Sequence, residues 1–359
     1  MRIVITLICS ISLFSCIDSS QLNTITHEVK LERVSELNLK NKPNGIRSIL
    51  QGLITDNKNE HIYGIDFRSR RLYTIDINNQ TIAFISSVGS GPNQFVLPIQ
   101  IAYDDGNLLV YDNSADRITV LDENKNMIYE TEGTLKHGVW TRGTYAFFRD
   151  EYFIASMKET SILNTLDFES ARAISILNIK TGEIQKGGKF PANIDRLDSF
   201  QKYPLLAYNL DNNSVYYVFY TWPDVQKLDL NTLENELKSN YTPSFMRKRT
   251  IKVDFNNPEL QTIEFAKKIG VDRTELITVD ISNGYFISTW KNYSEAYFDS
   301  IDPADIAYFG VRYSYPEFDN PQEFTIPGLP LGFYDGKLLI LENDDPLEFV
   351  IGLYEFIHE

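Results

Sequence analysis

The side chains best suited to bind a ligand are aromatic rings and guanidinium groups in segments that read as loops. They are Trp140, Trp222, Trp290, Arg68, Arg70 and Arg142. An indole ring stacks on a sugar or a peptide group, and a guanidinium forms bidentate hydrogen bonds. Together they favour a site for a carbohydrate or an extended peptide. The alternative is that each tryptophan fills a gap inside the fold, since this residue is usually mostly buried.

Signatures of nucleophilic, phosphate-binding or metal chemistry are missing from the sequence. The four histidines are widely separated, and no Gly-x-Ser-x-Gly, Walker-type loop or helix-opening Gly-x-Gly-x-x-Gly occurs. Both cysteines lie in the first sixteen residues, so the rest of the chain has no thiol for zinc or for catalysis. We expect no cofactor. The one candidate position for a calcium ion is the acidic loop with Asp344 and Asp345, where a solvated loop is the alternative.

The composition excludes several classes of protein. The chain carries 34 Lys and Arg against 49 Asp and Glu, a formal net charge of -15, which opposes general binding to nucleic acid or to an anionic membrane. With 43% hydrophobic residues it has the material for a sizeable core. Tyr and Phe are abundant, and Asn-rich turns separate short apolar runs. These features favour an all-β protein over a helical bundle.

The N-terminus has the pattern of an export signal. The apolar run from Ile3 to Phe14 is shorter than the ~20 residues that a membrane-spanning helix needs. Leu13 to Cys16 resembles a bacterial lipoprotein signal, in which the cysteine is acylated and becomes the new N-terminus. We therefore predict a signal peptide at 1–15, a lipid on Cys16 and a tether at 16–27. A buried N-terminal strand or helix is the alternative.

A repeat is the strongest signal in the rest of the chain. Segments 62–66 and 71–76 resemble segments 108–112 and 117–122, each 46 residues later. Each copy has two apolar strands around a short polar loop and ends in an Asn-containing turn, as in a β-meander. With weaker copies further on, the chain contains six such units. Repeats of this length with four strands each predict a β-propeller.

The predicted fold is therefore all-β: a six-bladed β-propeller of four-stranded antiparallel blades, forming one domain at 28–359. Residues 28–39 precede the first unit, and we expect them to supply the outer strand of the last blade and close the ring. The stretch 257–270 has a capping residue, an early proline and a final glycine, which predict a short helical insertion between the fourth and fifth blades. Phe95 and Phe324 occupy equivalent repeat positions and are expected to be buried between blades.

Strand direction predicts which loops share a face of the ring. Because consecutive strands alternate in direction, the loop between the second and third strands of a blade lies on the same face as the loop that enters the next blade. The loops on that face include those with the three tryptophans and the three arginines named above. We therefore expect these six side chains to line one funnel.

The repeat also resembles a known group of proteins. The segments that carry the resemblance are Gly89 to Phe95, Pro98, Gly106, Tyr111 to Asp112 and Arg117 to Asp122. They look like the loop and blade pattern of the six-bladed NHL-like and TolB-like propellers. The whole chain resembles the uncharacterised six-bladed propeller lipoproteins of Gram-negative bacteria, most specifically at 60–130 and 320–345. The resemblance implies a fold and a place in the cell envelope, at the outer membrane, more than it implies a reaction.

These observations predict a lipid-anchored binding or scaffolding module of the cell envelope. We expect a monomer that binds a glycan, a peptide or an envelope protein, binds no nucleic acid, and contacts the membrane through its N-terminal lipid only. The alternative is a propeller hydrolase or lyase that acts on a polysaccharide with carboxylates in the central funnel. An enzyme should gather titratable groups deep in the funnel, whereas a binding module should show a broader aromatic and polar rim.

Overall fold

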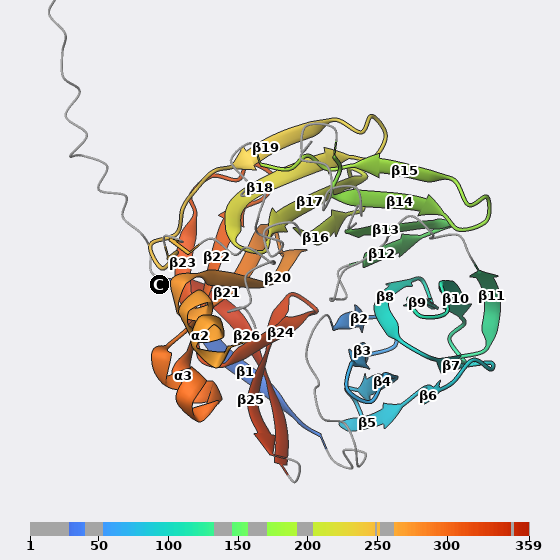
Figure 1. The fold of residues 1–359 in the computed structure, drawn as a ribbon, viewed down its shortest axis with the longest axis horizontal. Helices are drawn as coiled ribbons and strands as arrows, with labels where there is room; N and C mark the ends of the chain where they lie inside the picture. Colours follow the sequence, from blue (N-terminus) through green and yellow to red (C-terminus); the bar gives the residue numbers. More distant parts are fainter. Residues whose placement is uncertain are drawn as a thin grey trace, which may run out of the picture.

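Six four-stranded antiparallel sheets stand around a common axis (Figure 1). The structure is a computed structural model. It describes residues 29–39, 53–132, 146–156, 171–191, 204–247, 250–251, 262–345 and 348–358. The predicted six-bladed β-propeller is confirmed in these residues. None of the helices in the described ranges is long and apolar enough to cross a membrane.

The first three blades follow one another along the chain. Blade 1 consists of β2 (Ile54–Asp56), β3 (His61–Asp66), β4 (Arg71–Asp76) and β5 (Thr81–Phe84). Blade 2 consists of β8 (Pro98–Asp104), β9 (Asn107–Asp112), β10 (Arg117–Leu121) and β11 (Met127–Glu132). Blade 3 consists of β12 (Ala146–Arg149), β13 (Tyr152–Ser156), β14 (Ile174–Asn178) and β15 (Ile184–Gly187). Between blades 1 and 2, β6 (Ser87–Val88) and β7 (Gln94–Phe95) form a small parallel pair.

The second half of the ring follows the same plan. Blade 4 consists of β16 (Pro204–Asn209), β17 (Ser214–Phe219), β18 (Trp222–Asp229) and β19 (Asn235–Ser239). Blade 5 consists of β20 (Thr274–Ser282), β21 (Tyr285–Tyr293), β22 (Ile306–Ser314) and β23 (Gln322–Ile326). Blade 6 consists of β24 (Leu329–Tyr334), β25 (Lys337–Asp345), β26 (Glu348–His358) and β1 (Val29–Leu39).

Two-residue turns set the register of several blades. Asp105–Gly106, Asn283–Gly284 and Asp335–Gly336 each join the first two strands of a blade, and both residues of each pair have positive φ. Asp-Gly and Asn-Gly are the pairs that a type I′ hairpin turn prefers, because both positions need the left-handed region. The local sequence therefore determines where these hairpins reverse.

The core lies between the blades. The inner strands β2, β8, β12, β16, β20 and β24 surround the axis (Figure 1). In the described residues an apolar cluster fills each of the six junctions between neighbouring blades. Phe95 is fully buried between blades 1 and 2, and Phe324 is 5% exposed between blades 5 and 6. The prediction for these two rings is confirmed.

The ring closes through its N-terminal strand. β1 pairs antiparallel with β26, from Val29 opposite His358 to Leu39 opposite Phe349. It is the outermost strand of blade 6, whose other three strands come from the C-terminal end of the chain. This confirms the predicted closure.

The helical insertion lies where it was predicted, between blades 4 and 5, but α2 begins and ends later than the predicted 257–270. α2 spans Ile263–Asp272, begins at the N-cap Thr262 and continues two residues past Gly270. Gly270 is a packing position, because a Cβ there would lie 2.1 Å from Cζ of Phe298. Phe298 belongs to a second helix, α3 (Glu295–Ser300), which the sequence did not predict and which precedes the 3-10 turn η3 (Pro303–Asp305).

The two faces of the ring have different connections. The loop face is defined by the loops between second and third strands, which in blades 1, 2, 4 and 5 are residues 67–70, 113–116, 220–221 and 294–305. The turn face is defined by the turns between first and second strands, residues 57–60, 105–106, 150–151, 210–213, 283–284 and 335–336, and between third and fourth strands. Both α2 and α3 belong to the loop face, because they precede β20 and follow β21.

Candidate functional site

Two of the predicted arginines lie on the loop face of blade 1. Arg68 and Arg70 are exposed in the loop between β3 and β4. The carboxylate of the buried Asp66 accepts hydrogen bonds from the backbone N–H groups of Arg68 and Ser69, at 3.0 and 3.3 Å. Arg70 has a φ of 58°, in the left-handed region. The loop is therefore tied at its base, while both guanidinium groups face solvent.

Trp222 lies on the loop face of blade 4 and is half-buried. Its ring packs against the cluster between blades 3 and 4. Burial raises the pKa of the neighbouring Asp224 carboxyl, and the nearby indole of Trp222 lowers it by less. The indole Nε1 itself is enclosed without a hydrogen bond of regular geometry. The Trp222 side chain is thus partly packed inside the fold and partly exposed to solvent.

The prediction for Trp290 is wrong. This residue is 1% exposed in the cluster between blades 4 and 5, and its Nε1 donates to Oγ of Ser288 at 3.0 Å. The error has a structural cause: β21 runs on to Tyr293, so Trp290 is a strand residue and the loop begins only at Ser294. The ring fills a junction between blades and offers no surface to a ligand.

The other predicted positions lie outside the described residues. These are Trp140, Arg142 and Cys16, together with the side chains of Asp344 and Asp345, whose backbones belong to β25. In the ranges that the structure describes, no group of three or more His, Cys, Asp or Glu could hold a metal ion.

A buried ionic cluster joins blades 4 and 5, and it was not predicted from the sequence. Glu275, at the start of the inner strand β20, is 3% exposed. Its Oε1 lies 2.7 Å from Nη2 of Arg273, and its Oε2 lies 3.1 Å from Nζ of Lys291. The hydroxyl of Tyr220 donates to the same Oε2 at 2.8 Å. Three residues from three separate segments therefore meet on the carboxylate of Glu275.

The electrostatics of this Glu275 cluster follow from its burial. Desolvation tends to raise the pKa of Glu275, but the two cations and the tyrosine hydroxyl outweigh it and hold the pKa low. Desolvation likewise tends to lower the pKa of Lys291. The negative charge of Glu275 outweighs this effect, so the pKa of Lys291 is raised. The backbone carbonyl of Tyr220 also accepts the N–H of Leu276 at 2.8 Å. The cluster therefore locks the loop that leads into Trp222 onto blade 5.

A second tie holds α2 on the loop face. Nη1 of Arg247 donates to the carbonyl oxygens of Val271 and Tyr293, each at 2.7 Å. One carbonyl belongs to the last turn of α2 and the other to the end of β21. Burial lowers the pKa of Arg247. The guanidinium thus joins α2 to blade 5 through backbone groups that the helix end leaves available.

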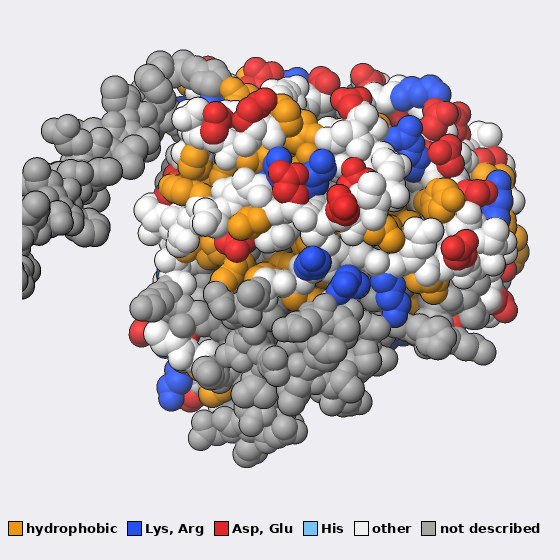
Figure 2. All heavy atoms as spheres, turned by 90° about the horizontal axis from the view of Figure 1, so that it is seen from above, with side chains coloured by type: hydrophobic (Ala, Val, Ile, Leu, Met, Phe, Trp, Pro, Cys, Tyr) orange, Lys and Arg blue, Asp and Glu red, His pale blue; other side chains and the backbone are white. Residues whose placement is uncertain are grey.

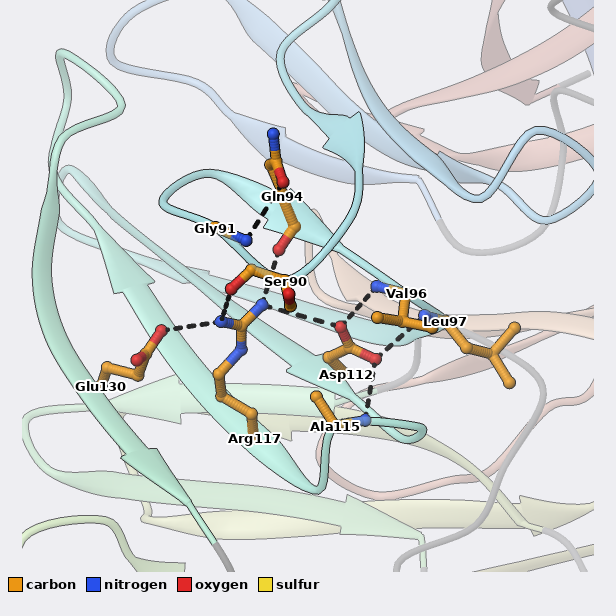
Figure 3. Close-up of polar contacts among 9 residues, drawn as sticks. All are labelled: Ser90, Gly91, Gln94, Val96, Leu97, Asp112, Ala115, Arg117 and Glu130. Carbon is orange, nitrogen blue, oxygen red and sulfur yellow. Dashed lines mark hydrogen bonds and ion pairs between the residues drawn. The ribbon is translucent and has the colours of Figure 1, made fainter.

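Asp112 and Arg117, at the end and the start of the repeat segments 108–112 and 117–122, hold the entry loop of blade 2 in place (Figure 3). The buried Asp112 accepts backbone N–H groups of Val96 and Leu97 at 2.6 and 2.9 Å. Arg117, 5% exposed, donates to the carbonyl of Gln94 at 2.6 Å and to Glu130 at 3.1 Å. The contacts of both side chains are to the loop before β8 and to blade 2 itself, so this pair positions the loop that enters the blade.

Asp280 is a carboxyl group near the axis. It lies on the inner strand β20, where Val279 and Ile281 pack toward blade 4. Its own side chain therefore points toward blade 6, because side chains alternate along a strand. Protein surrounds the carboxyl group although part of the residue contacts solvent. This burial raises its pKa to about 7, and the backbone N–H of Ile281 opposes the rise only in part.

Asp280→Asn is expected to change how stability depends on pH. With a native pKa of about 7 against 3.8, the folded state binds more protons than the unfolded state between these values, so stability falls as pH rises through that interval. The loss is at most about 4 kcal/mol, and the amide variant escapes it. Urea unfolding at pH 5 and pH 8 measures the difference. Asp335→Asn, at an exposed turn, is the control, and equal pH dependence of Asp280→Asn and the wild type would contradict the assignment.

The outer side of the ring over β19 and β15 carries no single sign of charge. Figure 2, which looks onto the ring over β19 and β15, shows acidic and basic side chains interspersed among apolar ones. This side of the ring therefore has no uniform electrostatic field.

Solved structures share this fold. No family model and no curated protein sequence matches the chain. A member of the DUF4221 family from Bacteroides vulgatus has 14% identity and a TM-score of 0.68, with 93% of this chain and 100% of that chain covered. A protein from Bacteroides fragilis that is inferred to be exported has 11% identity and a TM-score of 0.58, with 93% and 96% covered. At these identities the likeness shows the propeller fold alone.

Proposed function

We propose that this protein is an exported, lipid-anchored binding module of the bacterial cell envelope, held in the outer membrane through Cys16. Its loop face takes up a glycan, a peptide or a protein partner. The signal-like N-terminus supports the anchor. A structural neighbour that is inferred to be exported supports the location.

The observation that carries the binding role is that the loop face presents ligand-binding side chains on loops tied at their bases. Arg68 and Arg70 are exposed above the buried Asp66, and the loop before Trp222 is locked by Tyr220 on Glu275. Loops fixed in this way lose little conformational entropy when a ligand binds.

The geometry favours an extended ligand. Arg68 and Arg70 belong to blade 1 and Trp222 to blade 4, and these blades stand on opposite sides of the axis (Figure 1). A small molecule cannot contact both. An oligosaccharide, a peptide or a protein loop that crosses the axis on the loop face can reach the indole of Trp222 on one side and the two guanidinium groups on the other.

Trp222→Ala is expected to weaken binding by ~1 to 3 kcal/mol, the value of one large apolar contact. A glycan array and a peptide array identify the ligand, and calorimetry then compares variants. Arg68→Gln with Arg70→Gln should weaken the same ligand. Trp290→Phe is the matched control, because it alters a buried junction and should lower the unfolding temperature without weakening binding. Unchanged affinity in both Trp222→Ala and the double arginine variant would place the ligand elsewhere.

The second candidate is a polysaccharide hydrolase or lyase. Asp280 favours it, because this residue of the inner strand β20 is partly exposed to solvent and its pKa of about 7 suits general acid or base catalysis. Release of reducing ends from polysaccharides, abolished by Asp280→Asn, would support this activity over simple binding.

A further inference from the structure

We propose that the lipid anchor holds the propeller with its turn face toward the membrane and its loop face toward the aqueous compartment. The inference rests on the proposed acylation of Cys16 and adds the orientation in which the bound module is presented. It follows from strand direction and chain length, and the charge of the turn face limits how closely that face approaches the bilayer.

The direction of β1 determines where the anchor joins the ring. Val29, the first residue of β1, pairs with His358 at the end of β26. β26 begins at Glu348, beside the loop that follows β25, and therefore runs from the loop face to the turn face. Val29 accordingly lies on the turn face, and Leu39, at the other end of β1, lies on the loop face.

The number of residues before β1 limits the orientations that the anchor allows. Twelve residues separate Cys16 from Val29. Fully extended, such a segment reaches about 45 Å. β1 itself has 11 residues, and at about 3.3 Å per residue it spans about 35 Å from face to face. If the loop face lay at the membrane, the segment between Cys16 and Val29 would have to run along the rim of the ring, and this would use most of its reach. If the turn face lies at the membrane, the segment needs no such extension.

Charge keeps the turn face from lying flat on lipid. Exposed carboxylates occur in the described turns of blades 2 to 6, for example Asp105, Asp150, Asp211, Asp319 and Asp335. The exposed lysines in the described turns of the turn face are Lys58, in blade 1, and Lys180, in blade 3. The acidic excess repels anionic headgroups, but salt screens this repulsion beyond about 8 Å. The repulsion therefore keeps the turn face at a distance from the bilayer, but it does not reverse the orientation of the propeller.

A pair of labelled variants tests the orientation. Ser114 and Asn124 are exposed residues before and after β10, the former on the loop face and the latter on the turn face of the same blade. Ser114→Cys and Asn124→Cys each introduce one free thiol, since both native cysteines lie at or before Cys16. The acylated proteins, labelled with the same fluorophore, are reconstituted on phosphatidylglycerol vesicles that contain a headgroup quencher.

We expect a greater loss of fluorescence for the label at position 124 than for the label at 114. A loop 24 residues long, inserted after Ser20, should abolish the difference, because the lengthened segment reaches either face. Equal quenching in the unmodified tether, or stronger quenching at 114, would overturn the proposed orientation.

Failure of the anchor is distinguishable from failure of the orientation. Flotation with vesicles reports the anchor, and Cys16→Ser should lose it completely. A wild-type protein that does not float refutes the lipid anchor of the proposed function. A protein that floats but shows no difference between the two labels retains the anchor and refutes only the orientation.

Discussion

Deletion of residues 29–39 is expected to abolish the cooperative folding of the propeller. The deleted strand buries Val29, Leu37 and Leu39, which are 4, 4 and 5% exposed, at the two junctions beside blade 6. At ~1.5 to 3 kcal/mol for each side chain, their loss alone amounts to about 5 to 9 kcal/mol. A typical domain is stable by only ~5 to 15 kcal/mol.

The same deletion also exposes the edge of β26, an 11-residue strand whose outer backbone groups lose their partners in β1. Open edges of this length promote aggregation. Calorimetry and light scattering measure both effects. Deletion of residues 17–26, which precede β1, is the control and should leave the unfolding transition unchanged. A soluble protein that lacks 29–39 and unfolds at the wild-type temperature would refute closure by β1 as a source of stability.

Phe95→Ala and Phe324→Ala are each expected to destabilise the protein by ~3 to 5 kcal/mol, the cost of removing a buried aromatic ring. Phe95 is completely buried beneath the guanidinium of Arg117, 5.7 Å from the ring centroid. Phe324 packs edge-on against Phe356 and covers Gly310, where a Cβ would lie 2.0 Å from its Cζ. Neither site can collapse onto smaller neighbours without moving a blade.

Urea unfolding measures this loss, with the midpoint lowered and the slope retained. Phe95→Leu and Phe324→Leu keep most of the volume and should cost less. Ile263→Ala, at a residue that is 76% exposed on α2, serves as the surface control and should change stability by at most about 0.5 kcal/mol. Losses below about 1 kcal/mol for both alanine variants would show that the junctions tolerate cavities that close-packed interiors normally do not.

Local sequence was enough to predict the plan of the ring. Asp105–Gly106 marks a hairpin because both positions need positive φ, and the repeat places Phe95 and Phe324 at equivalent junctions. Closure by β1 was predictable as well, since residues 28–39 precede the first unit and were expected to supply the outer strand of the last blade. These features depend on residues that are close in the chain or recur at a constant spacing.

The polar interactions of the loop face depend on distant residues. Tyr220 and Glu275 are 55 positions apart, and their hydrogen bond exists because blades 4 and 5 pack together. Lys291 follows Trp290 in the sequence, yet one side chain enters this cluster and the other fills the apolar junction. Residue type alone does not indicate which side of β21 Trp290 or Lys291 occupies. The side is set by the alternation of side chains along β21 and by the extension of this strand to Tyr293.

The sequence by itself determined the number of blades, their hairpins, the closing strand and the rings at the junctions, because these follow from periodicity and from turn chemistry. Only the tertiary structure decided which functional candidates remain available. It buried Trp290, left Arg68 and Arg70 exposed, and enclosed Asp280 so that its pKa rises to about 7. The reason is that exposure and desolvation are set by the neighbouring blade, which is distant in the sequence and adjacent in space.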